Sequence, residues 1–131
     1  MSEGVMTYAQ CMDEADKRGL DVRVPKNNEL FIDIDSEEQL AMFHRQLAVF
    51  LKRTDAAWSM RPSPGGLPYH VHIVVTLTKR VVTNAERILL QAVLGSDPMR
   101  ELLSWERIEI GDPHPTLFFE KRVPAVLVED K

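Results

Sequence analysis

The chain has 131 residues, a formal net charge of −4 and a hydrophobic content of 44%. This length is typical of one domain with one core, and the hydrophobic content excludes a disordered chain. No apolar run approaches the roughly 20 residues of a membrane helix. The acidic balance gives no electrostatic argument for nucleic acid, but it does not exclude it. Because Cys11 is the only cysteine and the first residues lack a secretion signal, we expect a protein without disulfides in the cytoplasm.

The first third of the chain predicts a helix, a connector and a strand. Apolar residues at three- and four-residue spacing predict a helix over 5–18, and Gly19 is expected to end it. Residues 20–28 contain Pro25 and an Asn-Asn pair, which is typical of a connector. The segment ELFIDIDS, residues 29–36, alternates in the period of a strand.

The middle of the chain continues with a helix and two strands. Ser36 is expected to cap a helix over 37–53, since glutamates follow it in the first turn. Residues 56–61 predict a short strand, and SPGGLP, residues 63–68, predicts a loop. The segment YHVHIVVTL, residues 69–77, is rich in β-branched residues and predicts a strand.

The last third predicts two helices and a strand. Helices are expected over 84–94 and 98–107, and a final strand over 116–123. After the first helix, the order over residues 29–123 is β-α-β-β-α-β with a second helix before the last strand. This order is typical of a ferredoxin-like, RRM-like core. We therefore predict one α+β domain over 1–131: a four-stranded antiparallel sheet with helices on one face and an extra N-terminal helix.

Strand alternation groups several polar residues on one face of this sheet. Asp33 and Asp35 alternate with isoleucines, and His70 and His72 alternate with aliphatic residues. The aliphatic sets are expected to pack under the helices, which leaves the polar sets on the open face. The first and third strands of this fold are neighbours, so the four side chains are predicted to lie together. Glu120, on the last strand, is expected on the same face.

Such a face favours metal-dependent phosphoryl chemistry. Two carboxylates at positions i and i+2 of a strand repel each other, and a divalent cation compensates that charge. Hard oxygen ligands favour Mg²⁺ or Mn²⁺. A neighbouring imidazole can bind metal, contact phosphate or carry a proton. Together these groups suit phosphoryl transfer.

The segments LFIDID and SPGGLPYH resemble the archaeo-eukaryotic primase superfamily, which includes phage primase-polymerases. Asp33 and Asp35 match its Asp-x-Asp motif, and Ser63 with either His70 or His72 approximates its Ser-x-His motif. Phe119-Glu120 matches the third motif by strand position, with Asp112 as the alternative acid. The resemblance covers about residues 29–121. The loop after Ser63 is longer than the family motif, the third acid is Glu where the family usually has Asp, and no zinc-binding segment is recognised.

This resemblance implies nucleotidyl transfer with Mg²⁺ or Mn²⁺, in which Asp33, Asp35 and Glu120 bind metal. It implies that Ser63, His70 or His72 contacts the nucleotide. The implied partners are nucleic acid, nucleotides and other replication proteins, with no membrane. A phage-encoded protein would act in the cytoplasm of its host.

Two other interpretations remain. His70-Val71-His72 is similar to the metal-binding strand of HUH endonucleases, which use a tyrosine nucleophile. Tyr69 adjoins His70 and points to the opposite face, so Tyr8 is the candidate nucleophile. The third interpretation is a catalytically degenerate palm-like domain that binds nucleic acid or a protein partner.

Overall fold

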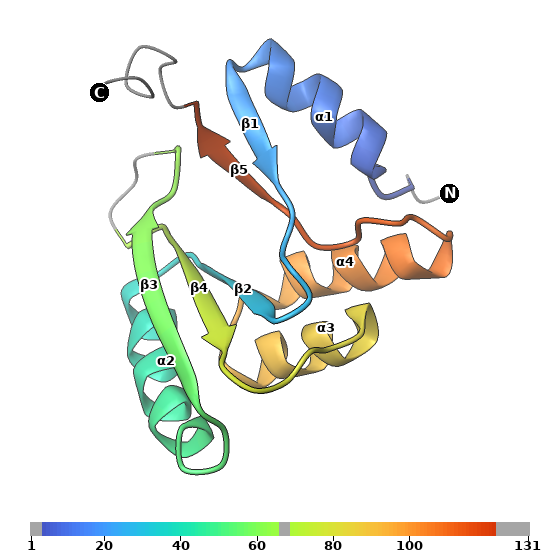
Figure 1. Cartoon of the computed structure of the whole chain (residues 1–131). Coiled ribbons are helices and arrows are strands. Elements are labelled where there is room, and N and C mark those ends of the chain that lie inside the picture. The colour runs from blue at the N-terminus through green and yellow to red at the C-terminus, as the bar shows by residue number, and fades with distance from the viewer. Residues whose placement is uncertain (1–3, 66–68, 123–131) are drawn as a thin grey trace, which may run out of the picture.

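The computed structural model describes residues 4–65 and 69–122 and has an α+β fold (Figure 1). In chain order its elements are α1 (Tyr8–Lys17), β1 (Leu20–Arg23), β2 (Glu29–Ile34), α2 (Glu37–Phe50), β3 (Ala56–Pro62), β4 (Val71–Leu77), α3 (Asn84–Val93), α4 (Pro98–Glu109) and β5 (Phe118–Lys121). Residues 66–68 of the predicted loop and residue 123 of the predicted last strand lie outside the described residues. Over the described ranges, no helix has both the length and the apolar character needed to cross a membrane.

The described strands form two small antiparallel sheets, whereas the sequence predicted one sheet of four strands. One sheet has the order β2-β4-β3, and the other pairs β1 with β5. The neighbouring position of the first and third core strands, β2 and β4, is confirmed. The last strand does not join them, because β5 pairs along Leu20–Arg23, a segment predicted as connector. Figure 1 shows the β1–β5 pair beside α1, away from the edge of β2.

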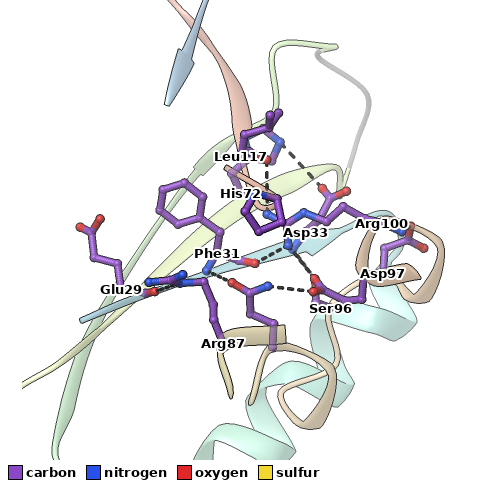
Figure 2. Close-up of polar contacts among 12 residues, drawn as sticks. Glu29, Phe31, Asp33, His72, Arg87, Ser96, Asp97, Arg100 and Leu117 are labelled. Atoms are coloured by element: carbon purple, nitrogen blue, oxygen red, sulfur yellow. Dashed lines mark hydrogen bonds and ion pairs between the residues drawn. The ribbon is translucent and has the colours of Figure 1, made fainter. Parts of the chain in front are cut away.

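The edge of β2 is closed to a further strand by hydrogen bonds from the segment that contains α3 and the start of α4 (Figure 2). The Phe31 N–H donates to Gln91 Oε1 at 2.7 Å, and the Asp33 N–H donates to Ser96 Oγ at 2.9 Å. The Asp33 carbonyl accepts from the Asp97 N–H at 2.8 Å. Side chains and one backbone amide thus take the places that a strand would fill.

The remaining outward groups of this edge are also bonded. The Glu29 carbonyl accepts from Arg87 Nε at 2.8 Å, and the Phe31 carbonyl accepts from the Arg100 guanidinium. The Glu29 N–H donates to the Lys26 carbonyl at 3.0 Å. Because buried backbone groups need a partner, this arrangement satisfies the edge without β5.

The two faces of β2 and β4 separate as the alternation predicts. The aliphatic face packs under α2 and α3 in a continuous core of Leu30, Ile32, Ile34, Phe43, Leu47, Ile73, Val75, Leu77, Val82 and Leu94. The opposite face was expected to be open, but Phe31, Val74 and Phe118 form a second, smaller core there. Phe118 at the start of β5 therefore covers part of the face that carries the polar residues.

We predict that Gln91→Ala lowers the free energy of unfolding by about 2–4 kcal/mol, because it leaves the Phe31 N–H without a hydrogen bond and removes one of the two hydrogen bonds to the buried Glu101 carboxylate, which keeps the one from Arg100. Urea unfolding followed by circular dichroism measures this change. Leu89→Ala, on the exposed side of the same helix, is the matched control and should change stability by less than about 0.5 kcal/mol. Equal effects of the two substitutions would contradict the role given to Gln91.

Candidate functional site

The four residues singled out on β2 and β4 lie together. Asp33 and His72 are direct cross-strand partners, with 3.8 Å between His72 Nε2 and Asp33 Oδ1. Just beyond the paired residues, His70 Nδ1 lies 3.7 Å from Asp35 Oδ1. The strand register thus produces two imidazole–carboxylate pairs, one inside the sheet and one at its end.

A third carboxylate joins the two aspartates. Asp97 is the N-cap of α4, and its Oδ2 accepts from the Arg100 N–H at 3.1 Å. Its own N–H donates to the Asp33 carbonyl, which fixes the start of α4 against β2. Ligand atoms of Asp33, Asp35 and Asp97 lie within 4.8 Å of one another. We call this group the carboxylate cluster.

The environment of the cluster opposes its negative charge. Burial raises the pKa of Asp33 to about 6; the Arg100 cation lowers it in part, and the nearby carboxylates raise it further. The pKa of Asp35 is also raised, first by burial and then by Asp97, while His70 opposes the shift. The Asp33 carboxylate is therefore poorly solvated and crowded by two other carboxylates, and a divalent cation would relieve that cost.

His72 is buried beside the cluster and is uncharged at neutral pH. Its ring stacks on Phe118, with centroids 3.9 Å apart, and Phe118 stacks on Phe31 at 4.4 Å. Burial, together with the cations of Arg100 and Arg61, lowers the pKa of His72 to about 4. Its Nδ1 atom is buried, and none of the residues that the structure describes forms a hydrogen bond with it. Only Nε2, on the Asp33 side of the ring, could therefore contact a ligand, and the neutral imidazole would bring no charge.

A pocket of about 240 Å³ opens beside Asp33 and His72. Ser63 lines it from the loop after β3, which brings this predicted residue to the site. Arg18, at the C-cap of α1, and Arg100, on α4, add two guanidinium groups. The Arg100 guanidinium lies 5.0 Å from the centroid of the Phe118 ring, and both residues line this pocket.

Glu120 lies on the other side of His72, and it is not part of the carboxylate cluster. Its carboxylate is 3.4 Å from Arg61 and 3.7 Å from Arg23. A second hollow of about 210 Å³ is lined by His72, Glu120 and Arg61. The alternative acid, Asp112, is a poorer candidate for the third metal ligand, because its carboxylate accepts hydrogen bonds from the Tyr8 and His114 N–H groups.

Tyr8 does not lie near the histidine pair. It starts α1, and its ring packs against His114 with centroids 4.5 Å apart. Arg18, which lines the pocket, is at the opposite end of the same helix, roughly 15 Å away along its axis. Figure 1 shows the N-terminal end of α1, which begins at Tyr8, near the last turn of α4. The tyrosine that an HUH endonuclease would need is therefore outside the site in this conformation.

The cluster fits a hard divalent cation by its chemistry. Three carboxylates supply oxygen ligands of the kind that Mg²⁺ and Mn²⁺ prefer. Within the described ranges, the nearest basic groups to Asp33 and Asp35 are the two imidazoles at 3.8 and 3.7 Å, and His72 is neutral at pH 7. The negative charge thus remains available to a metal ion.

Sequence reasoning missed three residues of the site. Asp97 was interpreted only as part of a helix start, and its position before Pro98 gave no sign that it would face β2. Arg18 and Arg100 were not singled out, because exposed arginines are common on helices. Only the contact of the α4 start with β2 brings Asp97 and Arg100 to Asp33.

Comparisons of the chain with models of protein families, with curated proteins and with solved structures found no match.

In metal-free buffer at pH 8, we predict that Asp33→Asn raises the free energy of unfolding by about 2–3 kcal/mol, since a pKa raised from 3.8 to about 6 means that burying the charged form costs stability. The folded state binds this proton more tightly than the unfolded state does. The advantage of the variant should therefore shrink as pH falls from 6 and vanish below about 4. Urea unfolding at several pH values measures it.

His72 provides the internal check on that experiment. Its lowered pKa means that the folded protein loses stability as pH falls from 6.5 towards 4, which offsets the gain from Asp33 in the wild type. In Asp33→Asn the gain from Asp33 is absent, so the loss of stability that His72 causes on acidification should be measurable directly. Asp13→Asn, at an exposed position on α1, is the control. If Asp33→Asn is no more stable than the wild type at pH 8, the cost assigned to the buried charge is wrong.

Proposed function

We propose that the chain is a metal-dependent nucleotidyl-transferase domain of the primase-polymerase type. The observation that carries the proposal is the carboxylate cluster beside the pocket of His72, Ser63 and Arg18. The family requires three acids, and we propose Asp97 as the third in place of Glu120. Asp97 has the residue type of the family's third acid, although it lies at the N-cap of α4 and not on a strand.

The arrangement of the larger sheet supports this assignment. The order β2-β4-β3, with α2 between β2 and β3, corresponds to the first three strands of a ferredoxin-like sheet. In the proposed relationship, the fourth position beside β2 is taken by the hydrogen bonds from α3 and α4. In this relationship β2, which carries the Asp-x-Asp motif, and β4, which carries His72, are neighbours, as in the ferredoxin-like sheet.

In this proposal Asp33, Asp35 and Asp97 hold Mg²⁺ or Mn²⁺, which would neutralise phosphate charge and align the attacking oxygen. Arg18 and the Ser63 hydroxyl line the adjacent pocket and would bind the phosphates of the nucleotide. His72 would donate an N–H to phosphate as a neutral group, because its pKa of about 4 keeps it uncharged at neutral pH. Arg100 would act by positioning, since it bonds the Phe31 carbonyl and the Glu101 carboxylate.

The direct test is synthesis of a labelled oligonucleotide on a single-stranded template with Mg²⁺ or Mn²⁺. We expect activity in the wild type and a loss on the order of 100-fold in Asp33→Asn and in Asp97→Asn, since each removes a carboxylate that would hold the metal ion. Denaturing gel electrophoresis of the products measures this.

Two further variants sharpen the test. Asp13→Asn, exposed on α1, should keep full activity and serves as the matched control. Glu120→Gln should lose far less activity than Asp97→Asn; the reverse order would show that the third acid is on β5. Absence of product with every template and both metals would contradict the proposal.

Metal binding can be measured without activity. We expect calorimetric titration to detect Mn²⁺ binding to the wild type, weakened at least about tenfold by Asp35→Asn. The same substitution at Asp13 should leave the affinity unchanged. If the chain binds neither Mn²⁺ nor nucleotide, the enzyme assignment fails, and a palm-like domain that binds nucleic acid or protein becomes the better interpretation.

A further inference from the structure

The outer edge of β3 carries unpaired backbone groups. Odd-numbered residues of this strand bond to β4, as the Thr78 N–H to the Asp55 carbonyl at 3.1 Å and the Ser63 N–H to the His70 carbonyl at 2.9 Å show. The N–H and carbonyl groups of Ala56, Trp58 and Met60 must therefore point away from β4. In the described part of the chain no strand pairs with this side of β3 (Figure 1).

This edge differs sharply from the edge of β2 at the other side of the same sheet. The outward groups of β2 all have partners from α3, α4, the connector between these helices or the turn before β2. Those of β3 have no such partner within residues 4–65 and 69–122, and almost all residues of the strand are exposed. An exposed, regular edge of this kind is a template for another strand. Pro62, which has no N–H, marks where a second strand would have to end.

We infer that β3 pairs with β3 of a second copy of this chain, antiparallel and centred on Trp58. In this register Trp58 faces Trp58 of the other copy, and Ala56 faces Met60 at each end. Each of these facing pairs exchanges two backbone hydrogen bonds, and none requires the missing N–H of Pro62. Moving the centre to Met60 would place Pro62 opposite Trp58 and lose that donor.

The charges of the strand are complementary to themselves in the same register. Asp55, directly before β3, and Arg61 within it are six residues apart and so share one face, and centring on Trp58 places Asp55 of each copy opposite Arg61 of the other. Both side chains are largely exposed, and their present ion pairs are long, 3.9 Å from Asp55 to Lys79 and 3.4 Å from Arg61 to Glu120. Opposite charges directly across two strands stabilise the pair.

The opposite face of the strand supplies apolar contact. Trp58 and Met60 are each 40% exposed at this edge. Trp58 packs against Phe43 and His44 of α2, with ring centroids 5.6 and 5.5 Å away. Pairing would bring the two Trp58 side chains beside each other between the two copies of α2. It would join two three-stranded sheets into one continuous sheet.

Sedimentation velocity of the full chain from micromolar to submillimolar concentration tests this inference. We expect reversible conversion from the 15.0 kDa monomer to a species of twice that mass. Met60→Pro removes an outward N–H without breaking a bond to β4, so the dimer should be lost. Met60→Thr keeps the N–H and is the matched control, which should still dimerise. A chain that stays monomeric throughout, or a dimer that persists in Met60→Pro, overturns the inference.

The charge pairs give a second test that fixes the register. Asp55→Arg and Arg61→Asp should each weaken dimerisation about tenfold or more, because each places like charges opposite one another. The double variant exchanges the charges and should restore the wild-type dissociation constant. Amide hydrogen exchange should slow with concentration at Trp58 and Met60 but not at Ala57 and Ser59. A dimer without charge rescue, or with protection elsewhere, would mean a different interface.

Discussion

The rest of the structure depends on how the outer edge of β2 is satisfied. Each backbone group that points away from β4 is bonded by a side chain or amide from a neighbouring segment, chiefly α3 and the start of α4. This requires buried charged and polar side chains: Arg87 and Glu101 are 4% and 5% exposed, and Gln91 is fully buried. Such groups add little net stability compared with apolar packing, but they specify one alignment of helix against strand. That alignment brings Asp97 and Arg100 to Asp33.

Much of the fold could be predicted from local patterns. Period-two alternation located β2 and β4 and separated their faces correctly, because one face is packed against helices. The pairing of β5 could not be predicted in the same way. Leu20–Arg23 is too short to stand out, and the preference of β5 for this strand depends on Gln91, Ser96 and Arg87 having already closed the other edge.

The candidate site likewise has one part that local sequence patterns predicted and another part that they did not. Alternation alone placed four of the site residues together: Asp33, Asp35, His70 and His72. Side chains that point to one face of a strand lie beside those of the paired strand that point to the same face. Asp97 is remote in sequence, and its place depends on where α4 starts in space. Glu120 was predicted on this face, but Phe118 separates it from the carboxylate cluster. The stacking of Phe118 on His72 divides the face into two hollows, and Glu120 lines the second one. Alternation along a strand identifies the face to which a side chain points, whereas packing decides which residues on that face come into contact.

The hydrogen bond from the Asp97 N–H to the Asp33 carbonyl has a consequence for motion. Through it, one carboxylate of the cluster is fastened to the main chain of the strand that bears the other two. The start of α4 cannot move outward without uncovering the edge of β2, and that edge is buried and fully bonded. Main-chain motions that would carry Asp97 away from the strand of Asp33 and Asp35 must then be sub-global openings of helix and strand together. The cluster is held together by the folding cooperativity of the domain.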